Sequence, residues 1–221
     1  MIGSELVTRL KAELNQLDTS SNRTVRPEMA LLFLNNAYLK LSRAKYKLSA
    51  GVVDDTAFQV TQLTTDELNH LTTSVYTIPV LSSDPEPVYT VDVATLPGYR
   101  YHLRSKMEVE YKQTRKWVSD INYKTLDTLN PTTLDPFNKP SPLEPVVYFE
   151  SGKIVIPFSG FTVKNYYITY QKFPDQITLV SDCVAPFIDE IVTTAAGLIL
   201  ESWGDPRAQS ILAINKVTAS E

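Results

Sequence analysis

Apolar residues recur at helical spacing near both ends of this chain and at strand spacing in between. Residues 26–48 alternate small and large apolar residues at steps of three and four, which predicts a helix with a heptad-like seam. Residues 99–111 alternate apolar and polar, which predicts an antiparallel strand with one solvated face. The chain is therefore predicted to be α+β, with N- and C-terminal helices forming a helical bundle and a large antiparallel β module inserted between them.

The same change of period sets the predicted domain boundaries. Residues 1–51 with residues 181–221 are expected to form the helical domain, and residues 52–180 the inserted β-rich domain. Short runs rich in β-branched and aromatic residues support the second assignment, namely VYTIPVL, VYTVDV, PVVYF, KIVIPF and TVKNYYITY.

Individual residues predict where several elements begin, bend or end. Ser4 is expected to cap the first helix, and Pro27 suits the first turn of the second. Pro186 is expected to open a C-terminal helix that Gly204 ends. Thirteen residues form an unusually long strand, so the strand at 99–111 either bends near Ser105 or belongs to a sheet that extends out from the body of the protein.

Composition excludes several classes of protein. Hydrophobic residues at 43% and charged residues at 21% are typical of a globular chain. The net charge of −4 offers no basic surface for wrapping nucleic acid. Cys183 is the single cysteine, so no intrachain disulfide or cysteine-based zinc cluster is expected. The N-terminus lacks a signal-peptide core and the longest apolar run is too short for a bilayer, so we expect a cytosolic origin and no membrane partner.

The residues that could carry chemistry are few and scattered. His70 and His102 lack the spacing of metal ligands, and no glycine-rich phosphate loop is present. Carboxylates such as Asp54, Asp55 and Glu67 leave a hydrolase as one hypothesis. We expect no catalytic residues, no cofactor and no metal.

Twelve tyrosines leave a second alternative open, a carbohydrate-binding or receptor-recognition module. Tyr166, Ile168 and Tyr170 share one strand face, which indicates a core or an interface more than a ligand platform.

Two adjacent asparagines interrupt the helix at 26–48. Asn35 and Asn36 point about 100° apart and flank the apolar seam, where polar side chains are unusual. We predict that at least one of the two amides forms a hydrogen bond across a helix–helix or subunit contact and fixes its register.

Three segments together resemble structural proteins of tailed bacteriophages: LPGYRYHLRSKMEVEY, DPFNKPSPLEPVVYFESGKIVI, and TVKNYYITYQKFPDQITL, which leads into PFIDEIVTTAAGLILE. The likeness is to head-to-tail connector proteins, and most of all to ring proteins of crAss-like, short-tailed phages. The helical frame around LNNAYLKL is similar to head-to-tail adaptors generally. The β insertion is longer than in minimal adaptors, which leaves open a second ring below the adaptor.

The resemblance implies a structural virion protein without enzymatic activity. It would form a homo-oligomeric ring, usually twelvefold, that joins the portal vertex to the tail and through which DNA only passes. Its partners would be other copies, the portal protein and neighbouring tail or ring proteins, with assembly in the cytoplasm of a bacterial host. The C-terminal segment from Ile211 would dock on the portal. The residues expected at subunit or partner contacts are Asn35, Asn36, Tyr38, Arg43, Ile211, Leu212, Ile214 and Asn215.

Overall fold

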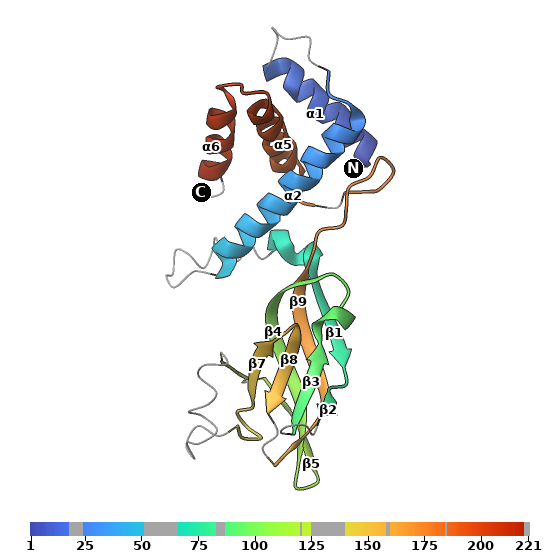
Figure 1. Ribbon diagram of the computed structural model, residues 1–221, viewed down its shortest axis with the longest axis vertical. Coiled ribbons are helices and arrows are strands. Elements are labelled where there is room, and N and C mark those ends of the chain that lie inside the picture. The colour runs from blue at the N-terminus through green and yellow to red at the C-terminus, as the bar shows by residue number, and fades with distance from the viewer. Residues whose placement is uncertain are drawn as a thin grey trace. The chain divides into compact units, whose positions relative to one another are not determined.

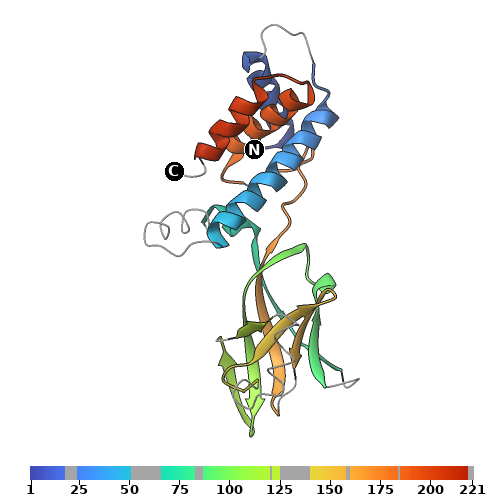
Figure 2. The same cartoon turned by 60° about the vertical axis from the view of Figure 1, so that its left-hand side comes forward.

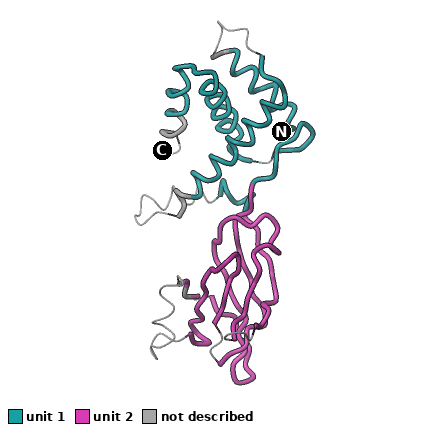
Figure 3. Tube along the Cα trace, in the orientation of Figure 1, with its two compact units in different colours: residues 1–71, 174–221 teal, residues 72–173 magenta. Residues whose placement is uncertain are grey.

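The computed structural model describes residues 1–17, 24–50, 66–82, 87–119, 121–124, 140–157, 160–183 and 185–218. It confirms a mixed α+β chain with helices at both ends (Figure 1). The chain divides into two compact units, a helical unit of Met1–Leu71 with Pro174–Glu221 and a β unit of Thr72–Phe173 (Figure 3).

The boundaries of these units lie after Leu71 and after Phe173, inside the range of 52–180 expected from the sequence. The flanking pieces belong to the helical unit because their apolar side chains are part of its core. Leu68 and Leu71 contribute from one piece and Ile177 from the other.

Four helices form most of the helical unit: α1 (Gly3–Leu17), α2 (Pro27–Ala50), α5 (Ile188–Ser202) and α6 (Ala208–Thr218), with the 3₁₀ turn η1 (Asn69–Leu71). Helices α5 and α6 lie side by side (Figures 1 and 2). The core between the helices contains fully buried residues from three of them, among them Leu6, Leu10, Ala30, Leu34, Ala37, Ile191, Ala195 and Leu200.

Helix α1 begins differently from the prediction, because Ser4 is inside the helix and does not cap it. The N–H groups of Gly3 and Ser4 donate instead to the carbonyls of Ser181 and Leu179, each at 3.0 Å. A Cβ atom at Gly3 would lie 1.8 Å from the Thr178 carbonyl oxygen, so only glycine fits. Backbone carbonyls of a distant segment thus satisfy the first helical donors.

The end of α5 follows the prediction, whereas its start lies at Ile188, two residues after Pro186. Gly204 has a φ of +72°, which permits the tight turn that ends the helix. The N–H of Asp205 then donates to the Leu200 carbonyl at 3.0 Å, closing the turn.

The β unit contains two sheets. The four-stranded sheet has the order β1 (Thr72–Thr77), β9 (Thr162–Lys172), β4 (Tyr99–Tyr111), β5 (Thr114–Val118). The five-stranded sheet has the order β2 (Val80–Ser82), β3 (Val88–Asp92), β8 (Lys153–Pro157), β7 (Val146–Glu150), β6 (Asn122–Lys124). Neighbouring strands are antiparallel except β6 and β7, which are parallel. The 3₁₀ turn η2 (Val93–Thr95) follows β3.

A single apolar core contains side chains from both sheets. Tyr166, Ile168 and Tyr170 of β9 are fully buried in it, together with Ile154 and Ile156 of β8. The tyrosine-rich face of β9 is therefore core, one of the two roles expected for it.

Strand β4 has the predicted bounds and is irregular along its length. Its register against β9 shifts between Tyr99 and Tyr101, between His102 and Arg104, and between Glu108 and Val109. Bulges of this kind bend a strand. One lies beside Ser105, where the sequence suggested a bend.

Candidate subunit interface

Helix α2 has one apolar face inside the helical unit. Ala30, Leu34 and Ala37 are fully buried and Leu41 is 8% exposed, and α5 packs against α2. The seam read from the sequence is thus the core-facing side of α2 over these turns, where small residues let the neighbouring helix approach closely.

A second line of residues, which we call the outer stripe, runs along α2 at steps of three and four. Its apolar members Met29, Leu32 and Leu39 are 47%, 53% and 40% exposed. Asn36 and Arg43 complete the stripe, and both are exposed. At about 100° per residue the centre of this stripe lies roughly half a turn from the buried seam. Helix α2 therefore carries apolar residues on two opposite faces, and the described residues of the unit cover the face of the seam.

Asn35 ties an extended segment of the helical unit to α2. Its Oδ1 accepts the N–H of Ile177 at 2.7 Å, and its Nδ2 donates to the Ile177 carbonyl at 3.0 Å. Nδ2 also donates to the Leu31 carbonyl one turn earlier, at 2.9 Å. The contact that Asn35 makes within the chain is thus with an extended segment and not with another helix. A subunit contact of Asn36, which is exposed, stays a prediction.

Tyr38, another of the expected interface residues, is inside the unit and only 5% exposed. His70 Nδ1 lies 2.7 Å from the Glu67 carbonyl, which can only accept, so Nδ1 donates. In the neutral ring Nε2 is then the acceptor, and it receives the Tyr38 hydroxyl at 2.7 Å. Burial raises the pKa of Tyr38 well above its usual value. The phenol is consequently a neutral donor within the core, with little surface left for a partner.

A buried lysine joins three elements of the same unit. Lys45 is 5% exposed, and its Nζ lies 2.7 Å from Glu67 Oε2 and 3.1 Å from Glu190 Oε1. The ammonium also lies 5.1 Å from the centre of the Phe187 ring. Glu67, one of the carboxylates considered for hydrolysis, is thus the ion-pair partner of a structural lysine. Asp54 and Asp55 lie outside the described residues.

The C-terminal helix turns its apolar side toward α5. Ile211 is 9% exposed and Leu212 is half-buried. A Cβ atom at Gly197 of α5 would lie 2.9 Å from Leu212 Cδ2, so the missing side chain makes room for α6. The side chains of Ile214 and Asn215 lie outside the described residues.

A chain of hydroxyls in the β unit was not foreseen from the sequence. Tyr166 donates to Ser105 Oγ at 2.6 Å, Ser105 Oγ lies 2.5 Å from the Tyr123 hydroxyl, and that hydroxyl lies 3.0 Å from His102 Nε2. Burial lowers the pKa of His102 to about 4 and raises that of Tyr166. At neutral pH every side chain in this row of hydrogen bonds is uncharged. It links β4, β6 and β9, and it has the form of a structural tie.

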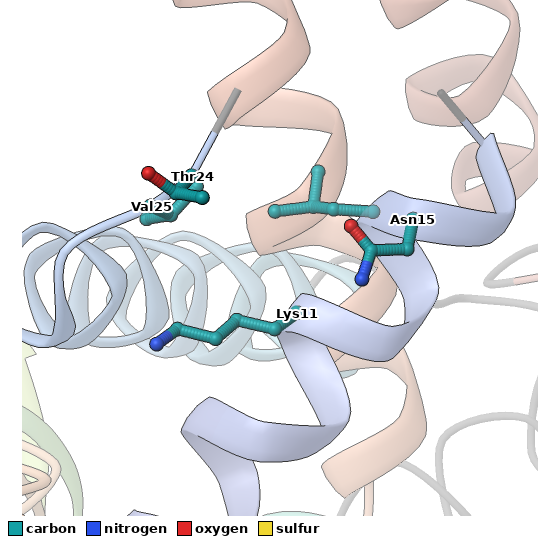
Figure 4. Close-up of a pocket in the computed structure, with 5 residues that line it drawn as sticks. Lys11, Asn15, Thr24 and Val25 are labelled. Atoms are coloured by element: carbon teal, nitrogen blue, oxygen red, sulfur yellow. The ribbon is translucent and has the colours of Figure 1, made fainter. Parts of the chain in front are cut away.

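A cavity of about 120 Å³ lies between α1 and the residues that lead into α2. Lys11 and Asn15 line it from α1, and Thr24 and Val25 line it from the opposite side (Figure 4). This volume is smaller than the roughly 300–1,000 Å³ typical of small-molecule sites. We assign no ligand to it.

Within the described residues, no group of three or more histidine, cysteine, aspartate or glutamate side chains is arranged to hold a metal ion. No helix in that part of the chain is long and apolar enough to cross a bilayer. Comparison of the sequence with family models and with curated proteins finds no match. Within the helical unit, the outer stripe of α2 is the described feature that points most directly to a protein partner.

Proposed function

We propose that this chain is a structural virion protein, a subunit of an oligomeric ring in the head-to-tail connector of a tailed bacteriophage. The ring is an adaptor or a tail ring, joins the portal vertex to the tail, and forms part of the conduit through which DNA passes. The helical unit makes the ring, and the β unit is a module inserted into it that meets the tail or neighbouring rings. The proposal assigns no enzymatic activity to the chain.

The observation that carries this proposal is the outer stripe of α2. A helix with apolar residues on two opposite faces is typical of one that lies between two neighbours. The helical unit supplies one neighbour, which packs on the seam around Leu34. A second copy of the chain is the partner that the ring proposal supplies. Covering a fully exposed leucine or methionine stabilises by about 1.5–3 kcal/mol, so three partly exposed residues provide several kcal/mol toward association.

The edge strands of the β unit offer further apolar surface for assembly. Ile78, Val80 and Leu81 are 74%, 67% and 53% exposed, and they lie where the chain passes from β1 to β2. Both strands are at the edges of their sheets in the described order. Exposed apolar edge strands are rare in monomers because they pair with other chains, and a ring assembled through heterologous contacts would cover them.

The test is the mass of the purified protein, measured by native mass spectrometry and by imaging negatively stained particles. We expect the natural chain to form rings of a single subunit number. Leu32→Glu combined with Leu39→Glu should give monomers with unchanged helical circular dichroism, because both side chains are exposed within the unit. Leu143→Glu changes a leucine that is 64% exposed in the β unit and serves as the matched control.

Two results would overturn the proposal. One is a natural chain that stays monomeric at all accessible concentrations and binds neither portal nor tail proteins. The other is a double variant that assembles as well as the control. If the control also loses ring formation while the natural chain keeps it, the β unit takes part in the subunit contact together with α2.

A second candidate function is a carbohydrate-binding or receptor-recognition module of a phage tail. The observation that favours it is a group of exposed aromatic side chains on the four-stranded sheet, of which Tyr76 is 69% and Trp117 is 43% exposed.

A further inference from the structure

Three aromatic rings and a lysine line a depression on one face of the four-stranded sheet. Tyr76 of β1 packs against Tyr167 of β9 with ring centres 4.6 Å apart, and its edge meets Trp117 of β5 at 6.1 Å. Lys106 of β4 and Ser119 complete the lining of an open depression of about 370 Å³. We call these five residues the aromatic bowl. Its volume is within the range of small-molecule sites.

Strand register explains why these side chains share one face. Tyr76 is paired with Tyr167, and Tyr167 is paired with Lys106 on its other side, so the three form one row across the sheet. Their chain neighbours Tyr166 and Met107 are fully buried in the core. Because side chains alternate along a strand, the row of the bowl faces away from the core.

The bowl contains a cation that the described part of the chain does not neutralise. Lys106 forms no ion pair with a described carboxylate, whereas nearby Glu110 is paired with Lys164 at 2.7 Å and Arg115 at 3.4 Å. Glu108, the next carboxylate along β4, accepts a hydrogen bond from Asn165. Hydrogen bonds from Ser74 and Thr169, and the positive charges of Arg104 and Lys106, lower the pKa of Tyr167. The positive charges of Arg104 and Lys106 therefore favour an anion beside Tyr167, whereas Glu108 is paired across the strands with Trp117 at the other end of the bowl.

The combination of surfaces defines a class of ligand. Aromatic faces stack on flat apolar faces, which pyranose rings and nucleobases both present. The lysine pairs with an anionic group, and the serine hydroxyl both donates and accepts. A groove that follows single-stranded nucleic acid needs a series of cations, but Glu108 and Glu110 follow Lys106 on the same face of β4. A single sugar ring with one charge fits the observations better.

We propose that the aromatic bowl binds a saccharide that carries a carboxylate or another anionic group. Tyr76 and Trp117 stand at 78° to each other, so one of them stacks on a face of the sugar ring and the other borders its edge. Lys106 pairs with the anionic group, and Ser119 forms a hydrogen bond with a ring substituent. This inference rests on the second candidate function and gives it a site and a ligand class. It does not depend on ring assembly.

Tryptophan fluorescence reports on this site directly. The chain contains two tryptophans, Trp117 in the bowl and Trp203 in the helical unit. In a Trp203→Phe background, Trp117 is the only tryptophan that emits. Titration of the full chain with glucuronate should change this emission saturably, with a Kd on the order of 1 mM for such an open site. Glucose serves as the matched sugar without a charge. A short oligothymidylate tests whether the bowl binds single-stranded nucleic acid instead.

Substitutions separate the two parts of the site. Lys106→Met should weaken glucuronate binding about three- to tenfold and leave glucose unchanged, as expected for a charge-assisted contact on an open surface. Tyr76→Ala should weaken binding of both sugars. Lys112→Met and Tyr111→Ala are matched controls, because Lys112 lies 5.2 Å from the Tyr111 ring elsewhere in the same unit. Neither control should change binding.

Each other outcome has a definite meaning. No saturable change with either sugar at tens of millimolar would overturn both the site and the second candidate function. Equal binding of glucose and glucuronate would keep a carbohydrate module but overturn the role of Lys106. Tighter binding of oligothymidylate would reassign the bowl to single-stranded nucleic acid. A loss of binding in the two controls as large as in Lys106→Met and Tyr76→Ala would mean that the ligand is not in the bowl.

Discussion

Asn35 holds an extended segment against α2 through both atoms of its amide. It accepts from the Ile177 N–H at 2.7 Å and donates to the Ile177 carbonyl at 3.0 Å, so both backbone polar groups of Ile177 are paired by one side chain. The next residue, Asn36, has the same chemistry but is exposed. The two asparagines thus give an internal comparison of one side chain in two environments.

We expect Asn35→Asp to lower the free energy of unfolding by about 1–3 kcal/mol, because a carboxylate keeps the acceptor but cannot donate to the two carbonyls. Asn36→Asp makes the same change at the next residue, which is exposed, and should lower the free energy of unfolding by less than about 0.5 kcal/mol. Urea unfolding of the two variants, followed by circular dichroism, measures the difference. Equal losses in both would show that the Ile177 contact adds nothing to stability.

At the scale of elements, the row of hydrogen-bonded side chains from His102 to Tyr166 connects three strands through uncharged groups. The ordinary pKa of histidine is 6.5, and burial lowers that of His102 to about 4. Its Nδ1 is buried without a hydrogen-bond partner among the described residues, so protonation would leave a charged donor unsatisfied. The ring also meets Phe149 edge-on at 5.4 Å.

A pH dependence follows from this lowered pKa. Between pH 6.5 and 4 the unfolded chain takes up a proton at His102 and the folded chain does not, so the free energy of unfolding falls as the pH is lowered. The contribution is complete above pH 6.5. When the pH is lowered from 7.5 to 5, we expect the free energy of unfolding to fall less in His102→Gln than in the natural chain. The midpoints of urea unfolding at each pH measure this difference.

All other ionisable groups are the same in the two proteins of this comparison, so the difference between them isolates His102. An equal loss of stability in the variant and the natural chain would contradict the lowered pKa. A larger loss in the variant would mean that His102 is charged in the folded β unit.

At the scale of elements, the sequence predicts the helices and strands in which apolar residues recur with a clear period. It misses those in which they do not. The 13-residue strand β4 has the bounds that its alternation indicated, and α2 begins at Pro27 as expected. β5 was missed because TRKWV has no alternation, and its residues before Val118 are all exposed. β6 was missed because it has only three residues. Such strands are defined by their partners.

The candidate interface shows a similar limit. The spacing of residues in α2 predicts a helix, and it correctly places Leu34 and Ala37 on a buried face. It does not tell which flank meets the rest of the unit. Tyr38 is buried because His70 and Phe187 pack against it, although these residues are distant in the sequence. The outer stripe was present at steps of three and four, but only its exposure distinguishes it from core.

For the whole molecule, the arrangement of strand ends suggests that the two units fold independently. The first residue of the β unit, Thr72, is paired with Gln171 near its end, so the chain enters and leaves through adjacent strands. Each unit also has its own apolar core. The sequence places the division at 51/52 and 180/181 because periodicity locates elements, whereas the actual boundaries depend on which core receives Leu71 and Ile177.

We expect a fragment of residues 72–173 to unfold cooperatively in urea and to keep the near-ultraviolet circular dichroism of its buried tyrosines. A fragment of residues 52–180 should be no more stable and more prone to associate, because it carries Leu68, Leu71 and Ile177 away from the core that buries them. The complementary chain, with Leu71 joined to Pro174 by a short Gly-Ser linker, should retain its helices, since directly paired residues of antiparallel strands lie only about 4.5–5.5 Å apart. If the shorter fragment is unfolded and the longer one folds, the flanking pieces belong to the β unit. If neither fragment folds, the β unit needs the helices for its stability, and the two cores are parts of one cooperative structure.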